Sequence, residues 1–303
     1  MIAGLVPAMS GGANKVQAAS GSGTEPSVSA YATKTQLMDG TFAPNADGTA
    51  VNYGKIVFGK KSDGTTAQEW YILGKDEGVS GDNTIIFAAS PIATVQKFDS
   101  SSTNKTDSNL WSECNYGGAS VTEVFANHYG ASELRAVLKG MTDGSNTSCF
   151  TTAEQGLMNA TTVKTKDTKN SNVTYTTTDK LYALQGNYND KNKLWAGTSD
   201  STVLAMSSYW SNGSWFWLRS PYADGDGSAL LALPGYSVLG DNLYFERAVQ
   251  PASNLNLSSV LFASAATAAS SDTVSGTLTD GTAMTLRLNG TGKNIGTVTY
   301  NTT

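Results

Sequence analysis

Apolar runs in the first half of the chain predict a small antiparallel sheet. Residues 53–59 and 69–73 are two apolar segments separated by the turn residues Ser62-Asp-Gly64, and residues 84–89 form a third, continuous apolar run. Short apolar runs bounded by turn residues are typical of strands. We therefore expect a hairpin followed by a third, buried strand.

Helical spacing follows between residues 109 and 158. Segments 120–127 and 131–139 carry apolar residues at helical intervals, and Leu134, Val137 and Leu138 fall on one face of the second segment. We expect Gly140 to end that helix. Thr151 and Glu154 resemble a capping box at the start of a short third helix, and the polar stretch 161–200 predicts loops with short strands.

The region from 203 to 251 alternates aromatic residues with Gly, Ser, Asn and Asp. The contiguous residues Phe216, Trp217 and Leu218, followed by Arg219-Ser-Pro221, predict a buried strand leading into a fixed turn, and residues 229–233 predict a second core strand. Aromatic residues in the turn-rich stretches around them are expected to be exposed.

The two ends of the chain have a different composition. Residues 1–19 combine an apolar stretch with an Ala-rich region and resemble the second half of a secretory signal, although a disordered tail is the alternative. We expect a signal remnant and leader over 1–49 and a main domain over 50–262. The alternating residues after 273 predict that 263–303 begins a β-rich, immunoglobulin-like module, so that the chain is a fragment of a longer surface protein.

Charge and composition exclude several partner classes. Charged residues make up 15% of the chain, the formal net charge is −5, and no basic cluster exceeds Lys60-Lys61. Nucleic-acid binding normally needs a basic patch, so no nucleic-acid partner is expected. No apolar run reaches 18 residues, which predicts no transmembrane segment. Cys114 and Cys149 either form one disulfide or remain free thiols.

Signals for catalysis are weak, and we expect the protein not to be an enzyme. The single histidine, His128, lies at a predicted helix C-terminus and is more consistent with a helix cap than with a catalytic base. Asp224-Gly-Asp226 is the one tight acidic pair; it suits either a calcium ligand set or a simple turn. No cofactor motif is present, and no metal site is predicted.

The aromatic-rich segment has the composition of a binding surface, since Tyr and Trp supply large rigid contact areas and Asn, Ser and Gly supply adaptable hydrogen bonds. The predicted ligand-binding residues share a turn-rich setting; they are Tyr209, Asn212, Trp215, Tyr222, Asp224, Asp226, Tyr236, Asp241, Asn242 and Tyr244.

Several motifs of the chain resemble a domain family of unknown function from surface proteins of gut Gram-positive bacteria. They are Phe216-Trp-Leu-Arg-Ser-Pro221, Arg247-Ala-Val-Gln-Pro-Ala252 and the upstream segments 69–73, 132–138 and 150–154. The resemblance covers about residues 50–262. It implies an α+β C-type-lectin-like fold, shared with formylglycine-generating-enzyme-like proteins and with the variable proteins of diversity-generating retroelements.

The resemblance implies roles for several residues. Trp217, Arg219, Pro221, Arg247 and Pro251 would be scaffold, and Gln250 departs from the pattern, in which Arg is more usual. Diversified surface positions would fall among Tyr209, Asn212, Tyr222, Asp224, Tyr236, Asp241, Asn242 and Tyr244. Neither cysteine matches the reactive arrangement of a formylglycine-generating enzyme, so that activity is not expected.

The sequence therefore predicts a secreted or surface-displayed, adhesin-like protein. It would bind a protein or glycan on another cell, a phage or the host through residues 207–250. Two alternatives remain: a carbohydrate-active hydrolase, which needs two convergent carboxylates, and a structural stalk or fibre subunit.

Overall fold

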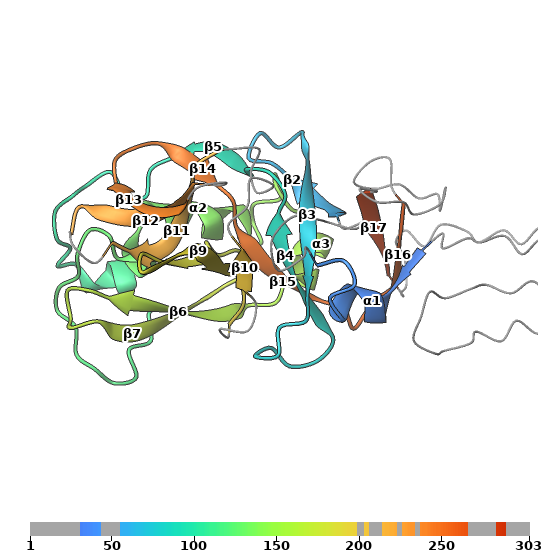
Figure 1. Cartoon of the computed structure of the whole chain (residues 1–303), viewed down its shortest axis with the longest axis horizontal. Helices are drawn as coiled ribbons and strands as arrows, with labels where there is room; N and C mark the ends of the chain where they lie inside the picture. The colour runs from blue at the N-terminus through green and yellow to red at the C-terminus, as the bar shows by residue number, and fades with distance from the viewer. Residues whose placement is uncertain are drawn as a thin grey trace, which may run out of the picture.

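The computed structural model describes residues 31–43, 55–198, 203–205, 214–222, 226–233, 237–265 and 283–288. Strands predominate over helices in these ranges. The helices are short, and each begins after a polar N-cap residue. They are α1 (Lys34–Met38), the 3₁₀ turns η1 (Ser108–Trp111) and η2 (Tyr129–Ala131), α2 (Glu133–Met141) and α3 (Thr152–Leu157). The expected α+β class, rich in strands and poor in helices, is therefore confirmed, and Figure 1 shows the arrangement of the elements.

A seven-stranded sheet forms one half of the described fold. Its strands in spatial order are β1 (Tyr31–Thr33), β16 (Val260–Ala265), β17 (Ala283–Leu288), β2 (Lys55–Lys60), β3 (Ala67–Gly74), β4 (Asn83–Ala88) and β15 (Ala252–Asn256). β2, β3 and β4 are antiparallel neighbours, so the hairpin and third strand predicted from the sequence are confirmed.

A five-stranded sheet forms the other half, with a β-hairpin beside it in Figure 1. The strand order of this sheet is β13 (Ser237–Asn242), β12 (Ser228–Leu233), β11 (Phe216–Pro221), β14 (Arg247–Val249) and β5 (Ala93–Gln96). The hairpin pairs β6 (Thr161–Asp167) with β7 (Val173–Asp179), and a small sheet joins β10 (Val203–Ala205), β9 (Asp190–Trp195) and β8 (Gln185–Asn187). The predicted core strands at 216–218 and 229–233 are buried, as expected.

Two hydrophobic clusters lie on opposite faces of the central strands. On β11 and β12, Trp217 and Leu231 belong to one cluster, whereas Phe216 and Leu230 belong to the other. The side chains of β3 and β4 alternate in the same way between these two clusters. Because successive strand residues point to opposite faces, these strands are covered on both sides, which explains why their sequences read as continuous apolar runs.

The region around α2 corrects two expectations. Segment 120–127 is not a helix: Val124 forms a β-bridge with Lys105, and the side chain of Asn127 donates to the carbonyl of Ser228. These tertiary contacts override the local apolar spacing. The second predicted helix is present as α2, capped by Ser132, but it continues through Gly140 to Met141.

The capping-box prediction is confirmed in α3. The Thr151 hydroxyl accepts from the Glu154 backbone N–H, and the Glu154 carboxylate accepts from the Thr151 backbone N–H. The other oxygen of Glu154 accepts from Gly59 in β2, so this cap also fixes the helix to the seven-stranded sheet.

The described parts of the two predicted end segments belong to the main sheet. Within the leader assigned to 1–49, β1 pairs with β16. Within the segment assigned to a separate module, β17 pairs antiparallel with β16 and parallel with β2. Residues 1–30, 266–282 and 289–303 lie outside the described residues, so the signal remnant and the module stay predictions.

Trp217 is the clearest test of this core. Its side chain is fully buried, its indole Nε1 donates to the carbonyl of Gln96 at 2.8 Å, and its ring packs edge-on against Phe98. We predict that Trp217→Ala lowers the free energy of unfolding by roughly 3–5 kcal/mol, measured by urea denaturation. Trp215→Ala, at an exposed position two residues away, is the matched control and should change it by less than about 0.5 kcal/mol. Equal losses in the two variants would contradict the assignment of core and surface.

Candidate ligand-binding surface

Three exposed aromatic residues cluster beside one arginine, which contacts two of them directly. Trp215, Tyr244 and Phe245 are 42%, 50% and 38% exposed. The guanidinium carbon of Arg247 lies 5.0 Å from the ring centre of Trp215 and 5.2 Å from that of Phe245, and the rings of Tyr244 and Phe245 meet edge to face at 4.8 Å. We call Trp215, Tyr244, Phe245 and Arg247 the aromatic surface.

Strand pairing brings these residues together. Trp215 precedes β11 and Arg247 begins β14, and the two strands pair in parallel, with Phe216 opposite Ala248. The backbone N–H of Ala248 donates to the carbonyl of Trp215 at 2.9 Å. Tyr244 and Phe245 lie in the turn between β13 and β14, which is closed by a hydrogen bond from Phe245 N–H to the Asn242 carbonyl.

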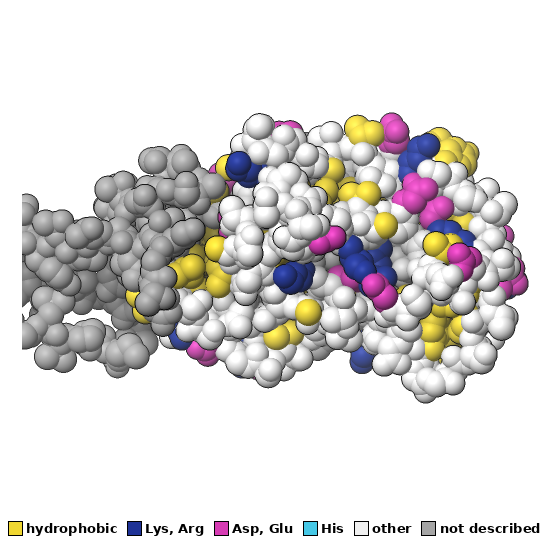
Figure 2. All heavy atoms as spheres, turned by 180° about the vertical axis from the view of Figure 1, so that it is seen from behind, with side chains coloured by type: hydrophobic (Ala, Val, Ile, Leu, Met, Phe, Trp, Pro, Cys, Tyr) yellow, Lys and Arg dark blue, Asp and Glu magenta, His cyan; other side chains and the backbone are white. Residues whose placement is uncertain are grey.

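The positive charge of Arg247 beside the rings is paired with Asp241. Arg247 Nε donates to Asp241 Oδ2 at 2.8 Å, and Nη1 donates to the carbonyl of Glu246 at 3.2 Å. An apolar centre with compensated charge and Trp, Tyr and Arg side chains is the composition of an interaction hot spot. On the face drawn in Figure 2, hydrophobic side chains appear as small separate patches, several of them beside charged side chains.

The structure places the predicted site residues in different settings. Trp215, Asp226, Asn242 and Tyr244 are exposed, as expected. Asp241 is half-buried in its ion pair with Arg247. The predicted positions Tyr209, Asn212, Asp224 and Tyr236 lie outside the described residues. Whether the exposed positions bind a ligand stays a prediction.

Tyr222 corrects the expectation of an exposed side chain. It is half-buried against the cluster of Phe216 and Leu230, and its ring meets that of Tyr188 edge to face at 5.0 Å. A Cβ at Gly240 would lie 2.8 Å from the Tyr222 ring, so the ring occupies the space that this glycine leaves open. Gly240 follows Leu239, whose side chain packs against the opposite cluster. Tyr222 therefore lies on the other face of the sheet from Asp241.

Sequence reasoning missed Phe245 and gave Arg247 only a scaffold role. Phe245 directly follows Tyr244, and Arg247 comes two residues later at the start of β14, so their closeness to Tyr244 in sequence is a signal that the sequence contained. Of the other residues implied as scaffold, Trp217, Arg219 and Pro251 are buried and Pro221 is half-buried. Gln250 is buried and donates from Nε2 to the Ala88 carbonyl at 2.7 Å, so it makes a scaffold contact without a charge.

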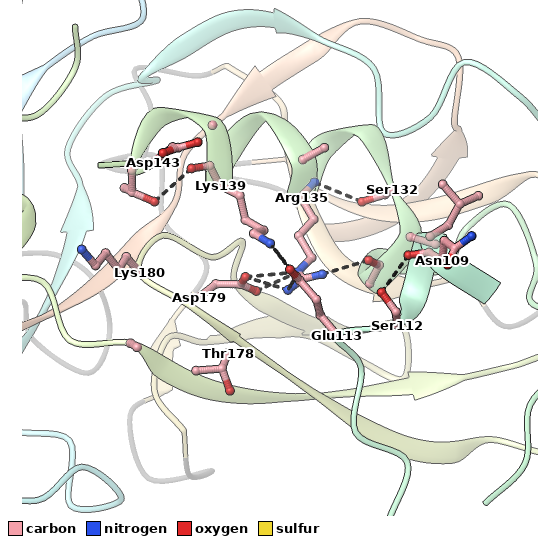
Figure 3. A pocket seen from close by; sticks show the side chains of 17 residues that line it. Asn109, Ser112, Glu113, Ser132, Arg135, Lys139, Asp143, Thr178, Asp179 and Lys180 are labelled. Atoms are coloured by element: carbon pink, nitrogen blue, oxygen red, sulfur yellow. Dashed lines mark hydrogen bonds and ion pairs between the residues drawn. The ribbon is translucent and has the colours of Figure 1, made fainter. Parts of the chain in front are cut away.

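A separate groove of about 690 Å³ lies beside α2, and we call it the α2 groove. Figure 3 shows Arg135 and Lys139 projecting from α2 toward Glu113 and Asp179, while Lys180 points away. The buried Arg135 donates from Nε and Nη2 to Asp179, from Nη1 to the Gly130 carbonyl, and from Nη2 to Glu113. The basic side chains that face Glu113 are thus already paired within the protein.

The carboxyl groups of the α2 groove do not resemble the acid of a hydrolase. The hydrogen bond from Lys139 and the charge of Arg135 lower the pKa of Glu113, and backbone and hydroxyl donors of Ser145 lower that of Asp143. A glycosidase acid needs a raised pKa. Neither Glu113 nor Asp143 meets that requirement.

His128 is the N-cap of η2 and not, as predicted, a residue at a helix C-terminus. It is buried, and its Nδ1 accepts from the Ala131 backbone N–H at 3.2 Å. The ring proton is therefore on Nε2, which donates to the Tyr116 hydroxyl at 2.7 Å, and this hydroxyl donates to Asp167 at 2.8 Å. Burial lowers the pKa of His128 to about 4, against a smaller raising effect of Asp167.

Cys114 lies beside this histidine, next to a hollow of about 550 Å³. A Cβ at Gly130 would lie 2.2 Å from Cys114 Sγ and 2.8 Å from His128 Cε1, so the three residues meet closely. Burial raises the pKa of the Cys114 thiol to about 12, which keeps it protonated at neutral pH. Both ring nitrogens of His128 already make hydrogen bonds, so the pair is not arranged as a nucleophile and base. Cys114 and Cys149 are both free thiols, which excludes the disulfide alternative.

Within the described residues, no group of three or more His, Cys, Asp or Glu side chains is placed to hold a metal ion. No helix in the same ranges is long and apolar enough to cross a membrane. A scan against protein-family models and searches of curated proteins and of solved structures found no match for the chain.

Replacing Asp179 tests the ion network of the α2 groove. Asp179→Asn would leave the buried guanidinium of Arg135 without its main counter-charge, and we predict a loss of about 3 kcal/mol in the free energy of unfolding. Glu113→Gln removes the partner that is 54% exposed and should cost less than about 1 kcal/mol. Urea denaturation of both variants measures the difference; a larger effect at Glu113 would be inconsistent with the buried pair as the anchor.

His128 predicts a pH dependence of stability. In the unfolded chain a histidine has a pKa of about 6.5, whereas in the folded protein the pKa of His128 is about 4. Between these values the unfolded state binds a proton that the folded state does not, so stability falls as pH falls from about 6.5 to about 4, by up to about 3 kcal/mol.

Because His128 is the one histidine of the chain, replacing it isolates this effect. His128→Asn keeps an N-cap acceptor and should flatten the dependence of the unfolding midpoint on pH between about 6.5 and 5. The midpoint is measured by thermal denaturation at a series of pH values. An unchanged slope in the variant would assign the effect to other groups.

Proposed function

We propose that this protein is a secreted or surface-displayed, adhesin-like binding protein whose ligand is a protein or glycan on another cell, a phage or the host. The observation that carries the proposal is the exposed cluster in which Trp215 and Phe245 lie against Arg247 and Tyr244 packs on Phe245. Trp, Tyr and Arg side chains are the residue types enriched at interaction hot spots. The low content of charged side chains and the signal-like N-terminus support an extracellular location.

We further propose that the main domain is a C-type-lectin-like domain. The mixture of short antiparallel sheets with a few short helices is compatible with that fold. The order of the motifs around Trp217 and Arg247 supports the same assignment. In this proposal the turn between β13 and β14 is a place where surface side chains vary, as in proteins diversified by retroelements.

Two observations favour binding over hydrolysis. The aromatic surface is separate from both hollows described above, whose lining residues include none of its members. In the α2 groove, Glu113 and Asp143 have lowered pKa values. Glu113 and Asp143 are therefore not suited to act as the acid of a hydrolase, whereas the exposed rings are available to a partner.

The test is a glycan and protein array screened with the full chain and with the double variant Trp215→Ala/Tyr244→Ala. We expect specific binding by the wild type and a loss of more than about 100-fold in affinity in the double variant, because truncation of a hot-spot aromatic residue typically costs at least 2 kcal/mol. Affinities of the array hits are measured by surface plasmon resonance, with and without Ca²⁺.

The control variant is Leu110→Ala, which removes another exposed apolar side chain, at the α2 groove. It should bind as the wild type does. Equal losses in the two variants would argue against the aromatic surface. Absence of any binding together with self-assembly at micromolar concentration would instead support the stalk or fibre subunit.

A further inference from the structure

We infer that Arg247 is the positioning residue of the aromatic surface, holding the rings of Trp215 and Phe245 in the orientation in which they meet the ligand. The inference rests on the proposed function. It adds that Arg247 orders the rings and that the surface selects a ligand with a hydrogen-bond acceptor beside an apolar face. Its evidence is the geometry of one guanidinium group.

The guanidinium of Arg247 contacts two rings at once. Its carbon lies at nearly equal distances from the ring centres of Trp215 and Phe245, 5.0 and 5.2 Å. A guanidinium within about 6 Å of an aromatic ring is attracted to the ring face. Trp215 and Phe245 are 42% and 38% exposed, so part of each side chain faces solvent. Tyr244 contacts Phe245, whereas Arg247 contacts both rings and links them to each other.

The guanidinium itself is held from two directions. Nε is bound to Asp241 at the end of β13, and Nη1 is bound to the backbone carbonyl of Glu246. Arg247 also begins β14, where it pairs with Gln96 of β5. The rings are thus held by a group that is tied to two strands.

The third guanidinium nitrogen of Arg247, Nη2, indicates which chemical group the ligand presents. Nη2 of Arg247 makes no hydrogen bond within the part of the chain that the structure describes, and its side chain is 26% exposed. A ligand that covers the rings therefore meets a free donor beside them. We infer a carbonyl or carboxylate acceptor next to an apolar face of the ligand.

Rings that are already ordered before binding increase the affinity for a ligand. A ligand that meets mobile rings must immobilise each of them, at a cost of about tenfold in affinity for a typical side chain. Lysine cannot replace Arg247, because an ammonium group lacks the planar surface that stacks on two rings and the fork that reaches Asp241 and a carbonyl together.

The first experiment needs no ligand. Acrylamide quenching of tryptophan fluorescence is measured on the full chain and on Arg247→Lys, and the contribution of Trp215 is obtained by subtracting the same measurements on Trp215→Phe variants. We expect quenching of Trp215 to rise in Arg247→Lys while the melting temperature stays within about 2 °C of the wild type. Lys169→Ala, which removes a cation at 5.1 Å from the ring of Phe125, is the matched control and should leave quenching unchanged.

The second experiment uses the strongest hit of the array. Arg247→Lys should bind it at least about tenfold more weakly, and Asp241→Asn should show a smaller loss with the same rise in quenching. Unchanged quenching of Trp215 in Arg247→Lys would overturn the inference, and so would increased quenching with undiminished binding. If the wild type binds nothing on the array, the proposed function fails, whereas the quenching result still decides whether Arg247 orders the rings.

Discussion

The aromatic surface depends on one backbone hydrogen bond, from the N–H of Ala248 to the carbonyl of Trp215. This hydrogen bond sets the register of β14 against β11. The parallel pairing of the two strands then places Arg247 beside Trp215, although the two residues are distant in sequence. The same register directs Trp217 into the core, where its indole donates to Gln96 on β5. Because side chains alternate along a strand, the buried Trp217 and the exposed Trp215 are two positions apart on the same face.

Buried arginines hold the irregular segments around this sheet. Arg219 donates to the carbonyls of Lys164 and Ala183 and to the side chain of Gln185, which ties β11 to β6 and to the segment that enters β8. Arg135 connects α2 to Asp179 at the end of β7. In a chain with few charges, every guanidinium nitrogen of these two residues donates at least one hydrogen bond, which offsets part of the cost of burying an ion.

The sequence allowed the prediction of elements whose pattern is local. The strands around Ile56, Trp70 and Ile86 and the capping box at Thr151 follow from periodicity and from a short motif, and they are present. Segment 120–127 shows the limit, because the bridge of Val124 to Lys105 and the contacts of Asn127 are tertiary and leave no trace in local spacing. The same holds for His128, whose partners come from three other segments.

The candidate site was predictable in composition but not in arrangement. Aromatic residues in turns indicated exposure, which is correct for Trp215 and Tyr244. Composition did not reveal that Tyr222 lies on the opposite sheet face over Gly240, because that depends on strand register. Composition also did not reveal that Asp241 forms an ion pair with Arg247, because that ion pair depends on the pairing of β14 with its neighbours.

These constraints divide the surface into fixed and replaceable positions. Arg247, Asp241 and the backbone of β11 are bound to one another, so their replacement disturbs the geometry of the rings. Asn242 ends β13, and Tyr244 lies in the turn that follows. The backbone of Asn242 makes its hydrogen bonds, because its carbonyl accepts from Phe245 and its N–H donates to the Asp241 carboxylate. Exposed turn side chains tolerate substitution with little effect on stability. In the proposed binding role, the rings and Arg247 would supply affinity, and exposed neighbours such as Asn242 would supply the differences between ligands.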